Sequence, residues 1–195
     1  MKKFLIIAAL AMTSFVSAQK GTVLVGGNID YSSTTVDYRT DEFKSNKFSF
    51  SPRVGYQFND NWTVGGEFTI SSSKNDSNAR FEEGKTSGSR FGAFVRYSVP
   101  LNQTFSVFAD LGAGFQNQTE KGYTSNGVYT KTKADGVYVG VTPALFINMK
   151  KGFGLNFSIG GLGYETLSYD NNGADVSSFN FNFGKTASIG ISKNF

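Results

Sequence analysis

The feature that most constrains this chain is a strict alternation of residue types, which is clearest at its C-terminal end. Over residues 179–195 the odd positions are mostly Phe, Ile or Ala, and the even positions are Asn, Gly, Ser or Thr. Successive side chains of a β-strand point to opposite faces. A strand with this sequence therefore has one apolar, aromatic face and one face of small or polar residues.

The same period of two recurs in seven earlier segments. The eight alternating segments span residues 21–31, 47–58, 62–71, 89–99, 104–116, 134–147, 152–164 and 179–195. The chain has 23 Gly, 20 Phe and 9 Tyr but only 3 Pro, a mixture that favours strands with aromatic faces. The sequence therefore predicts an all-β fold of eight antiparallel strands, each long enough for a tilted crossing of a bilayer, which takes about 9–11 residues.

The connections between these segments alternate in length. Short ones lie at residues 59–61, 100–103 and 148–151, and long polar ones lie at 32–46, 72–88, 117–133 and 165–178. Short turns at one end and long loops at the other are typical of an outer-membrane barrel, whereas a β-sandwich has no reason to sort its loops in this way.

The N-terminus carries a different signal. Lys2 and Lys3 precede an apolar run at residues 4–12, and Val16, Ser17 and Ala18 precede Gln19. This is the pattern of a secretory signal peptide, so residues 1–18 are predicted to be removed and residues 19–195 to form one barrel domain. The formal net charge then falls from +4 to +2 because two lysines are lost, and we infer no nucleic-acid partner from it.

Arithmetic on the short turns predicts the register. A hairpin centred on Asp60 sets Arg53 opposite Glu67, and one centred on Gln103 sets Arg96 opposite Asp110. These four residues lie on the predicted inner face, and the interior of an eight-stranded barrel is just wide enough to be filled by side chains. We interpret them as lumen ion pairs that act as struts in a packed polar interior; the alternative is that they are selectivity charges in a narrow solute or ion pore.

Other residues share this predicted inner face. They are Asp30, Arg90, Phe94, Phe108, Tyr138, Phe146, Leu162 and Tyr164. The predicted outer face is aromatic and almost without charge, apart from Lys185 and Lys193 near the C-terminus.

With these patterns, residues 19–195 resemble the small eight-stranded outer-membrane β-barrel family of Gram-negative bacteria, which contains the OmpA transmembrane domain and OmpX. The resemblance implies an antiparallel up-and-down transmembrane β-barrel, set in outer-membrane lipid as a monomer. It also implies a C-terminal signal, read by the barrel-assembly machinery, on Ala187, Ile189, Ile191 and Phe195. Lys193, at the second position from the end, departs from the family pattern.

No histidine or cysteine occurs in the chain. Enzymes that share this type of barrel use histidine as an acid or base, so a non-enzymatic protein without cofactor or metal is expected. The sequence favours a barrel of the cell outer membrane with an envelope-structural role, or with a surface ligand bound by its long extracellular loops. Two alternatives are the narrow pore and a soluble periplasmic barrel that binds an apolar ligand; the outward aromatic residues argue against the second.

Overall fold

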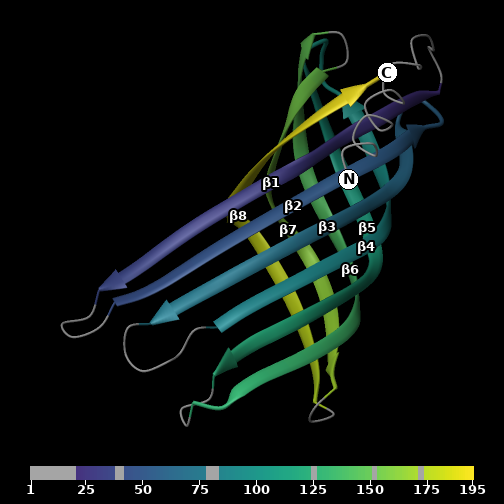
Figure 1. Cartoon of the computed structure of the whole chain (residues 1–195). Helices are drawn as coiled ribbons and strands as arrows, with labels where there is room; N and C mark the ends of the chain where they lie inside the picture. Colours follow the sequence, from purple (N-terminus) through teal and green to yellow (C-terminus); the bar gives the residue numbers. More distant parts are fainter. Residues whose placement is uncertain (1–20, 38–41, 78–83, 124–126, 151–152, 171–173) are drawn as a thin grey trace, which may run out of the picture.

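Eight antiparallel strands, each paired with its neighbours in chain order, form a closed barrel in the computed structural model of the chain (Figure 1). The structure describes residues 21–37, 42–77, 84–123, 127–150, 153–170 and 174–195, so the predicted signal peptide lies outside the described residues. In this part of the chain no helix has the length and apolar character needed to cross a membrane. The strands are β1 (Thr22–Asp37), β2 (Glu42–Gln57), β3 (Trp62–Ser77), β4 (Gly84–Pro100), β5 (Phe105–Tyr123), β6 (Tyr129–Lys150), β7 (Phe153–Tyr169) and β8 (Asp175–Asn194).

The alternation of the sequence sorts side chains between the two faces of the barrel. On β4 and β5, Phe91 and Phe115 point outward and are 67% and 71% exposed, whereas Phe94 points inward and is 1% exposed. A barrel with an aromatic outer face and a filled inner face is suited to a surrounding of lipid. The all-β barrel fold predicted from the sequence is confirmed.

The two short turns at residues 59–61 and 100–103 have the register predicted for them. Tyr56 pairs with Val64 across the first turn, and Val99 pairs with Val107 across the second. Each turn is held by an asparagine whose side-chain oxygen accepts backbone N–H groups two and three residues further on. Asn59 accepts from the N–H groups of Asn61 and Trp62 at 2.9 Å each, and Asn102 binds the next turn in the same way. Such Asx turns fix the residue at which the chain reverses direction between two strands.

The prediction of four long loops is wrong. Strand pairing continues through most of these segments, to Asp37 opposite Glu42 in the first hairpin and to Tyr123 opposite Tyr129 in the third. The ladder is made by main-chain groups, so polar side chains do not end it, and Thr and Tyr favour strands. The barrel therefore carries extended hairpins at the end opposite the short turns.

A bulge in β7 reverses the expected orientation of two residues. The register of β7 shifts against both neighbours around Gly160, whose φ of 111° is a conformation that favours glycine. One extra residue moves every later side chain to the opposite face. Leu162 and Tyr164 were expected inside but each is 44% exposed on the outer face, beside Val141 and Val139 of β6.

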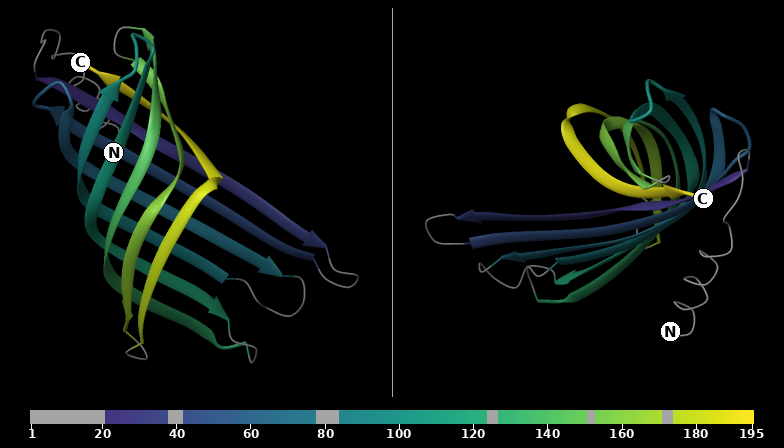
Figure 2. Two further views of the ribbon diagram at one scale, coloured as in Figure 1. Left: turned by 180° about the vertical axis from the view of Figure 1, so that it is seen from behind. Right: turned by 90° about the horizontal axis from the view of Figure 1, so that it is seen from above.

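The barrel closes along only part of its height. Strands β1 and β8 pair over Leu24–Asn28 against Gly190–Asn194, at the end that carries the short turns. Beyond this point β8 bends away and runs beside β7, while β1 continues beside β2 (Figures 1 and 2). Among the residues whose placement the structure describes, the two strands thus leave a seam, defined here as the unpaired edges of β1 after Asn28 and of β8 before Gly190.

Candidate functional site: the polar network of the lumen

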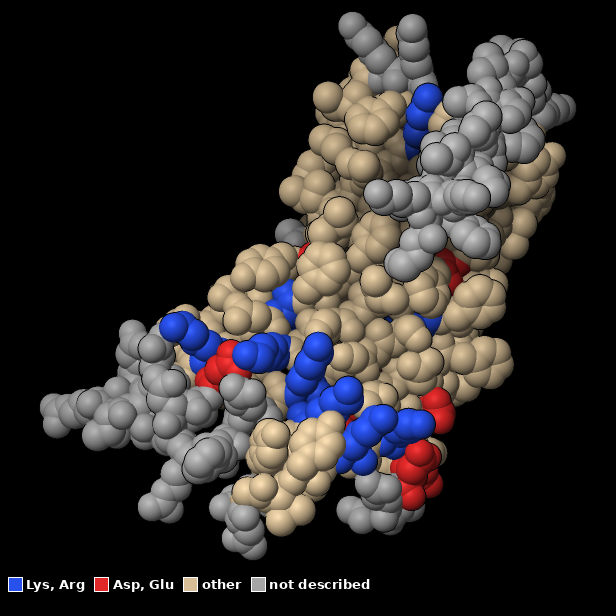
Figure 3. All heavy atoms as spheres, viewed as in Figure 1, with Lys and Arg blue, Asp and Glu red and all other residues tan. Residues whose placement is uncertain are grey.

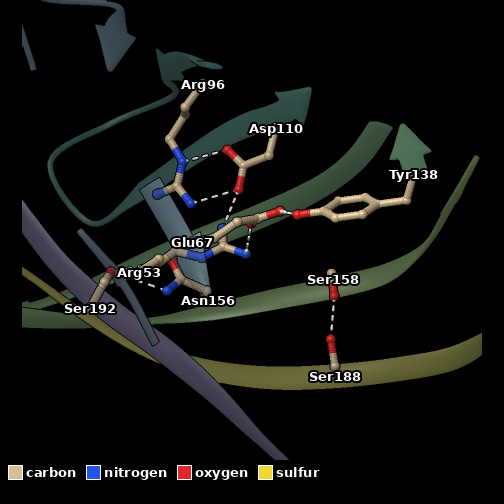
Figure 4. A network of polar contacts seen from close by, with 9 residues as sticks. All are labelled: Arg53, Glu67, Arg96, Asp110, Tyr138, Asn156, Ser158, Ser188 and Ser192. Atoms are coloured by element: carbon tan, nitrogen blue, oxygen red, sulfur yellow. Dashed lines mark hydrogen bonds and ion pairs between the residues drawn. The ribbon is translucent and has the colours of Figure 1, made fainter. Parts of the chain in front are cut away.

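Four strands contribute charged side chains to one network inside the barrel (Figure 4). Arg96 of β4 donates to both oxygens of Asp110 of β5, from Nε at 2.6 Å and from Nη2 at 2.8 Å. Arg53 of β2 donates from Nη1 to Asp110 Oδ2 at 2.5 Å, and its Nη2 lies 3.5 Å from Glu67 Oε2 on β3. Both pairings derived from the sequence are present, but Arg53 also joins them into one network through Asp110.

The contact between Arg53 and Asp110 crosses the lumen. Strands β2 and β5 are not neighbours in the sheet, so this ion pair connects separate parts of the barrel wall. The sequence arithmetic could not find it, because register relates only adjacent strands. The pair ties the charged residues together across the interior rather than along the wall.

Aromatic rings pack against the arginines of this network. The Cζ of Arg96 lies 3.7 Å from the ring centroid of Phe108, and the Cζ of Arg53 lies 5.3 Å from that of Phe94. A guanidinium over an aromatic face is stabilised by the ring quadrupole, more strongly where water is excluded. Arg96 and Asp110 are only 5% and 7% exposed, so the centre of the network is shielded from water.

A second set of contacts extends the network toward the hairpin end. The Tyr138 hydroxyl of β6 donates to Glu67 Oε1 at 2.9 Å, and the Cζ of Arg90 lies 5.3 Å from the Tyr138 ring centroid. Arg90 in turn pairs with Glu165 at 2.5 Å. A side chain at Gly92 would overlap the Tyr138 hydroxyl and the backbone of Ala113, so glycine leaves the room that this tyrosine needs.

Glu165 is the functional residue that sequence reasoning missed. The expected alternation of β7 ended at Tyr164 and placed Glu165 in a loop. Because the bulge at Gly160 shifts the alternation, Glu165 points inward and meets Arg90. The signal in the sequence was the adjacent pair Gly160-Gly161, since glycine inside a strand pattern often marks a bulge.

The charges of the network balance. Arg53, Arg90 and Arg96 face the three carboxylates Glu67, Asp110 and Glu165. Side-chain rings that select ions in pores carry an excess of one sign. The balanced network gives no such excess, and its groups are held to one another.

Two cavities of the lumen lie on opposite sides of the network. One, of about 560 Å³, lies on the side of Arg90 and Tyr138 and is lined by Gly, Ser and Asn of β7 and β8. The other, of about 150 Å³, lies on the side of Arg96 and Phe108, toward the short turns. Arg53, Glu67 and Asp110 line the first cavity and Arg96 lines the second, so the network lies between them. Beside it is a void of only about 30 Å³, which Arg53, Arg96 and Asp110 also line.

The C-terminal residues lie at the closed part of the barrel. Ile189 and Ile191 point outward and are 57% and 54% exposed, and the side chain of Ala187 lies outside the described residues. The backbone of Phe195 exchanges hydrogen bonds with that of Val23, at 3.0 and 3.2 Å. Lys193 places its ammonium 4.2 Å from the Phe195 ring centroid, so the lysine that departs from the family pattern lies against the terminal aromatic residue.

Comparisons with known proteins agree with this architecture. Residues 4–186 match the family model described as outer membrane protein beta-barrel domain. The outer membrane protein OprG from Pseudomonas aeruginosa has a similar fold, with 13% identity, a TM-score of 0.50 and coverage of 90% of this chain and 96% of that chain. A search of the curated proteins finds no match.

Two further solved structures overlap with the chain at lower TM-scores. The attachment invasion locus protein Ail of Yersinia pestis, solved in complex with the heparin analogue sucrose octasulfate, has 17% identity and a TM-score of 0.47, with 90% of this chain and 97% of that chain covered. Neisserial surface protein A has 14% identity and a TM-score of 0.44, with the same two shares covered.

Proposed function

Because the chain belongs to the family of outer membrane protein beta-barrel domains, we propose that it is a non-enzymatic integral barrel of the outer membrane. Its role is structural in the envelope or interactive at the cell surface. The signal peptide at residues 1–18 directs export and is cleaved, and the barrel-assembly machinery reads the C-terminal residues. The mature barrel lies in outer-membrane lipid as a monomer.

The observation that carries this proposal is the layer of paired charges across the lumen. Arg53 and Arg96 converge on Asp110 from different strands, and Phe94 and Phe108 fill the space around them. Breaking such buried pairs is costly because it leaves a charge without its partner. A barrel with this interior serves as an anchor, and its contacts with other molecules are made by its outer surface and its extended hairpins.

A narrow pore is the second candidate, and one observation favours it. The cavity of about 560 Å³ beyond the network is lined by polar and small residues and is large enough to hold water. A path to the other side must pass Asp110, beside which the void is only about 30 Å³. The pore candidate therefore predicts conductance that depends on Arg53 and Arg96.

Planar-bilayer conductance of the folded barrel separates the two candidates. We expect a silent bilayer for the native protein, with folding verified by heat-dependent gel mobility. Arg53→Ala and Arg96→Ala are measured beside it. Sustained unitary steps in the native protein that change in these variants contradict the filled lumen and establish a small pore.

A further inference from the structure

Four lysines occupy directly opposed positions on four consecutive strands. Lys74 of β3 pairs with Lys85 of β4, Lys85 pairs with Lys121 of β5, and Lys121 pairs with Lys131 of β6. We call these four residues the lysine row. Figure 3 shows Lys and Arg side chains gathered in a band across the lower part of the molecule, toward the extended hairpins.

The lysine row points to the outside of the barrel. Lys85 lies six residues from Phe91 on β4, and Lys121 lies six residues from Phe115 on β5, in ladders without a register shift. An even separation keeps both residues of each pair on the same face of the strand. Since Phe91 and Phe115 are exposed on the outer face, the lysines are on that face too.

The row runs parallel to the apolar surface. Phe68, Phe91, Phe115 and Val137 are opposed across the same four strands and form a row of their own. Six residues of strand separate the two rows, about 20 Å along the strand. On β4 and β5 the outward positions between the rows are Ser87, Ser89, Asn117 and Thr119, and on β6 they are Lys133 and Asp135. On β4 and β5 the outer surface therefore changes from apolar to small and polar and then to basic, the order met on leaving the hydrocarbon layer.

Charges of one sign at directly opposed positions are unfavourable for the sheet by itself. Opposed residues have Cβ atoms about 4.5–5.5 Å apart, and like charges at this spacing destabilise the pair. Lys74 is 3.0 Å from Asp76, but among the described residues no carboxylate forms an ion pair with Lys85 or Lys121. Lys44 and Lys133 are exposed nearby on β2 and β6 and add positive charge, and the exposed Asp135 of β6 adds one negative charge.

We propose that the lysine row binds the phosphate groups of anionic lipids in the membrane leaflet around the hairpin end of the barrel. A phosphomonoester carries negative charge and several acceptor oxygens, and each lysine ammonium supplies three donors. One phosphate between two opposed lysines offsets their repulsion. Lysines near an anionic lipid surface gain affinity in the same way in other membrane proteins.

The position of the row selects lipid over a soluble polyanion. The lysines lie on the outer face of the barrel wall, between the hairpin tips and an apolar row that itself requires acyl chains as neighbours. The phosphate of a lipid can bind the lysine row while its acyl chains cover the apolar row. A soluble sulfated polysaccharide can bind only the lysine row. The inference rests on the membrane placement in the proposed function, but not on whether the lumen conducts.

The test is a binding titration on the folded barrel, purified in neutral detergent from the outer membranes of an expressing bacterium. The probes are fluorescent phosphatidic acid, which carries a phosphomonoester, and fluorescent phosphatidylcholine, which is zwitterionic. We expect phosphatidic acid to bind more tightly. The double variant Lys85→Gln with Lys121→Gln is expected to weaken phosphatidic acid binding by about fivefold per lysine and to leave phosphatidylcholine unchanged.

Lys47→Gln is the matched control. Lys47 pairs with Ser73, next to Lys74 in the chain, but its alternation with the outward Phe48 places it on the inner face. This variant should bind both lipids as the native protein does, and the double Lys→Arg variant should keep the preference. If the double Gln variant does not fold, as judged by heat-dependent gel mobility, the single variants K85Q and K121Q give the result.

Three outcomes overturn the inference. They are equal affinity of the native barrel for both lipids, a preference that survives in the Gln variants, and lysine-dependent binding of a soluble sulfated polysaccharide without any lipid preference. None of these depends on conductance. A barrel that prefers phosphatidic acid and also conducts contradicts the filled lumen alone.

Discussion

At the scale of single residues, Asp110 is the one carboxylate of the described lumen network that two arginines share. Its two oxygens accept hydrogen bonds from Arg96 and Arg53, and its side chain is 9% exposed. Removing this carboxylate leaves the guanidinium groups of Arg53 and Arg96 without their main hydrogen-bond acceptor, in a part of the lumen that is shielded from water. Truncating either arginine leaves Asp110 with one remaining arginine, so the carboxylate is the more sensitive position.

We predict that Asp110→Ala destabilises the barrel by about 3–5 kcal/mol, the cost of breaking a buried ion pair. Glu165→Gln is the control, since the Arg90–Glu165 pair is 45% and 28% exposed and such a pair contributes about 0.2–1 kcal/mol. The measurement is urea unfolding in lipid vesicles, followed by fluorescence of Trp62, the only tryptophan. Equal effects of the two variants contradict a central role for Asp110.

The sequence predicts part of this network, for a physical reason. The pairing of Arg53 with Glu67 and of Arg96 with Asp110 depends only on turn position, which two asparagines fix locally. The contact between Arg53 and Asp110 depends on the width of the lumen and on side-chain conformation. Neither can be derived from the alternation of residues along a strand.

At the scale of secondary structure elements, Gly160 decides which face the second half of β7 presents. Its positive φ inserts the bulge, and a side chain there would overlap the backbone oxygen of Asn182. The strict alternation assumed from the sequence fails at this residue. As a result Leu162 joins Leu111 and Val141 in a cross-strand row on the lipid face, and Glu165 turns into the lumen.

We predict that Leu162→Lys destabilises the barrel in lipid vesicles by about 2–4 kcal/mol, the cost of a lysine on the lipid face near the bilayer midplane. Asn182→Lys, on the neighbouring strand and lining the polar cavity, should cost clearly less because water reaches the new ammonium group. Urea midpoints of the two variants in the same vesicles make the comparison. The reverse order of stabilities is the result expected if Leu162 faced the lumen, as simple alternation implies.

The extended hairpins show a second limit of sequence interpretation at this scale. Polar runs such as residues 117–133 have the composition of loops, yet most of this run is strand in β5 and β6. Once the apolar part of a hairpin fixes the register, further residues extend the ladder of main-chain hydrogen bonds. The entropy cost of each addition is low because the two strands are already held side by side. Composition therefore marks where the strands leave the apolar layer, and not where they end.

At the scale of the whole molecule, the seam distinguishes this barrel from a uniformly closed one. Every strand pair except β1 with β8 continues through most of its length, whereas in the described part of that pair residues 23–28 lie against residues 190–195. Unpaired backbone groups in a hydrocarbon layer cost several kcal/mol each, so an open edge is tolerated only where it meets water or protein. The seam is therefore the place where the barrel wall can admit water or a further chain.

Cysteine cross-linking tests whether the seam stays open in the membrane, and the absence of native cysteine makes the result unambiguous. Cysteines at Val25 and Lys193, which are paired, should form a disulfide in oxidised vesicles. A cysteine at Thr35 combined with one at Phe179, Phe181 or Phe183 should not, because a disulfide requires Cα atoms within about 7 Å. The readout is gel mobility before and after reduction.

Three partner positions are needed for Thr35 because the register of β8 shifts against β7 between Ser158 and Gly160, and a closed seam could keep or lose that shift. If one of the three pairs cross-links as completely as Val25 with Lys193, the edges of β1 and β8 pair with each other in the membrane. The seam is then open only when the protein is not surrounded by lipid. If none does, the edges stay apart where acyl chains surround them. Water from the lumen must then solvate these backbone groups, which places the cavity of about 560 Å³ in contact with the gap in the wall.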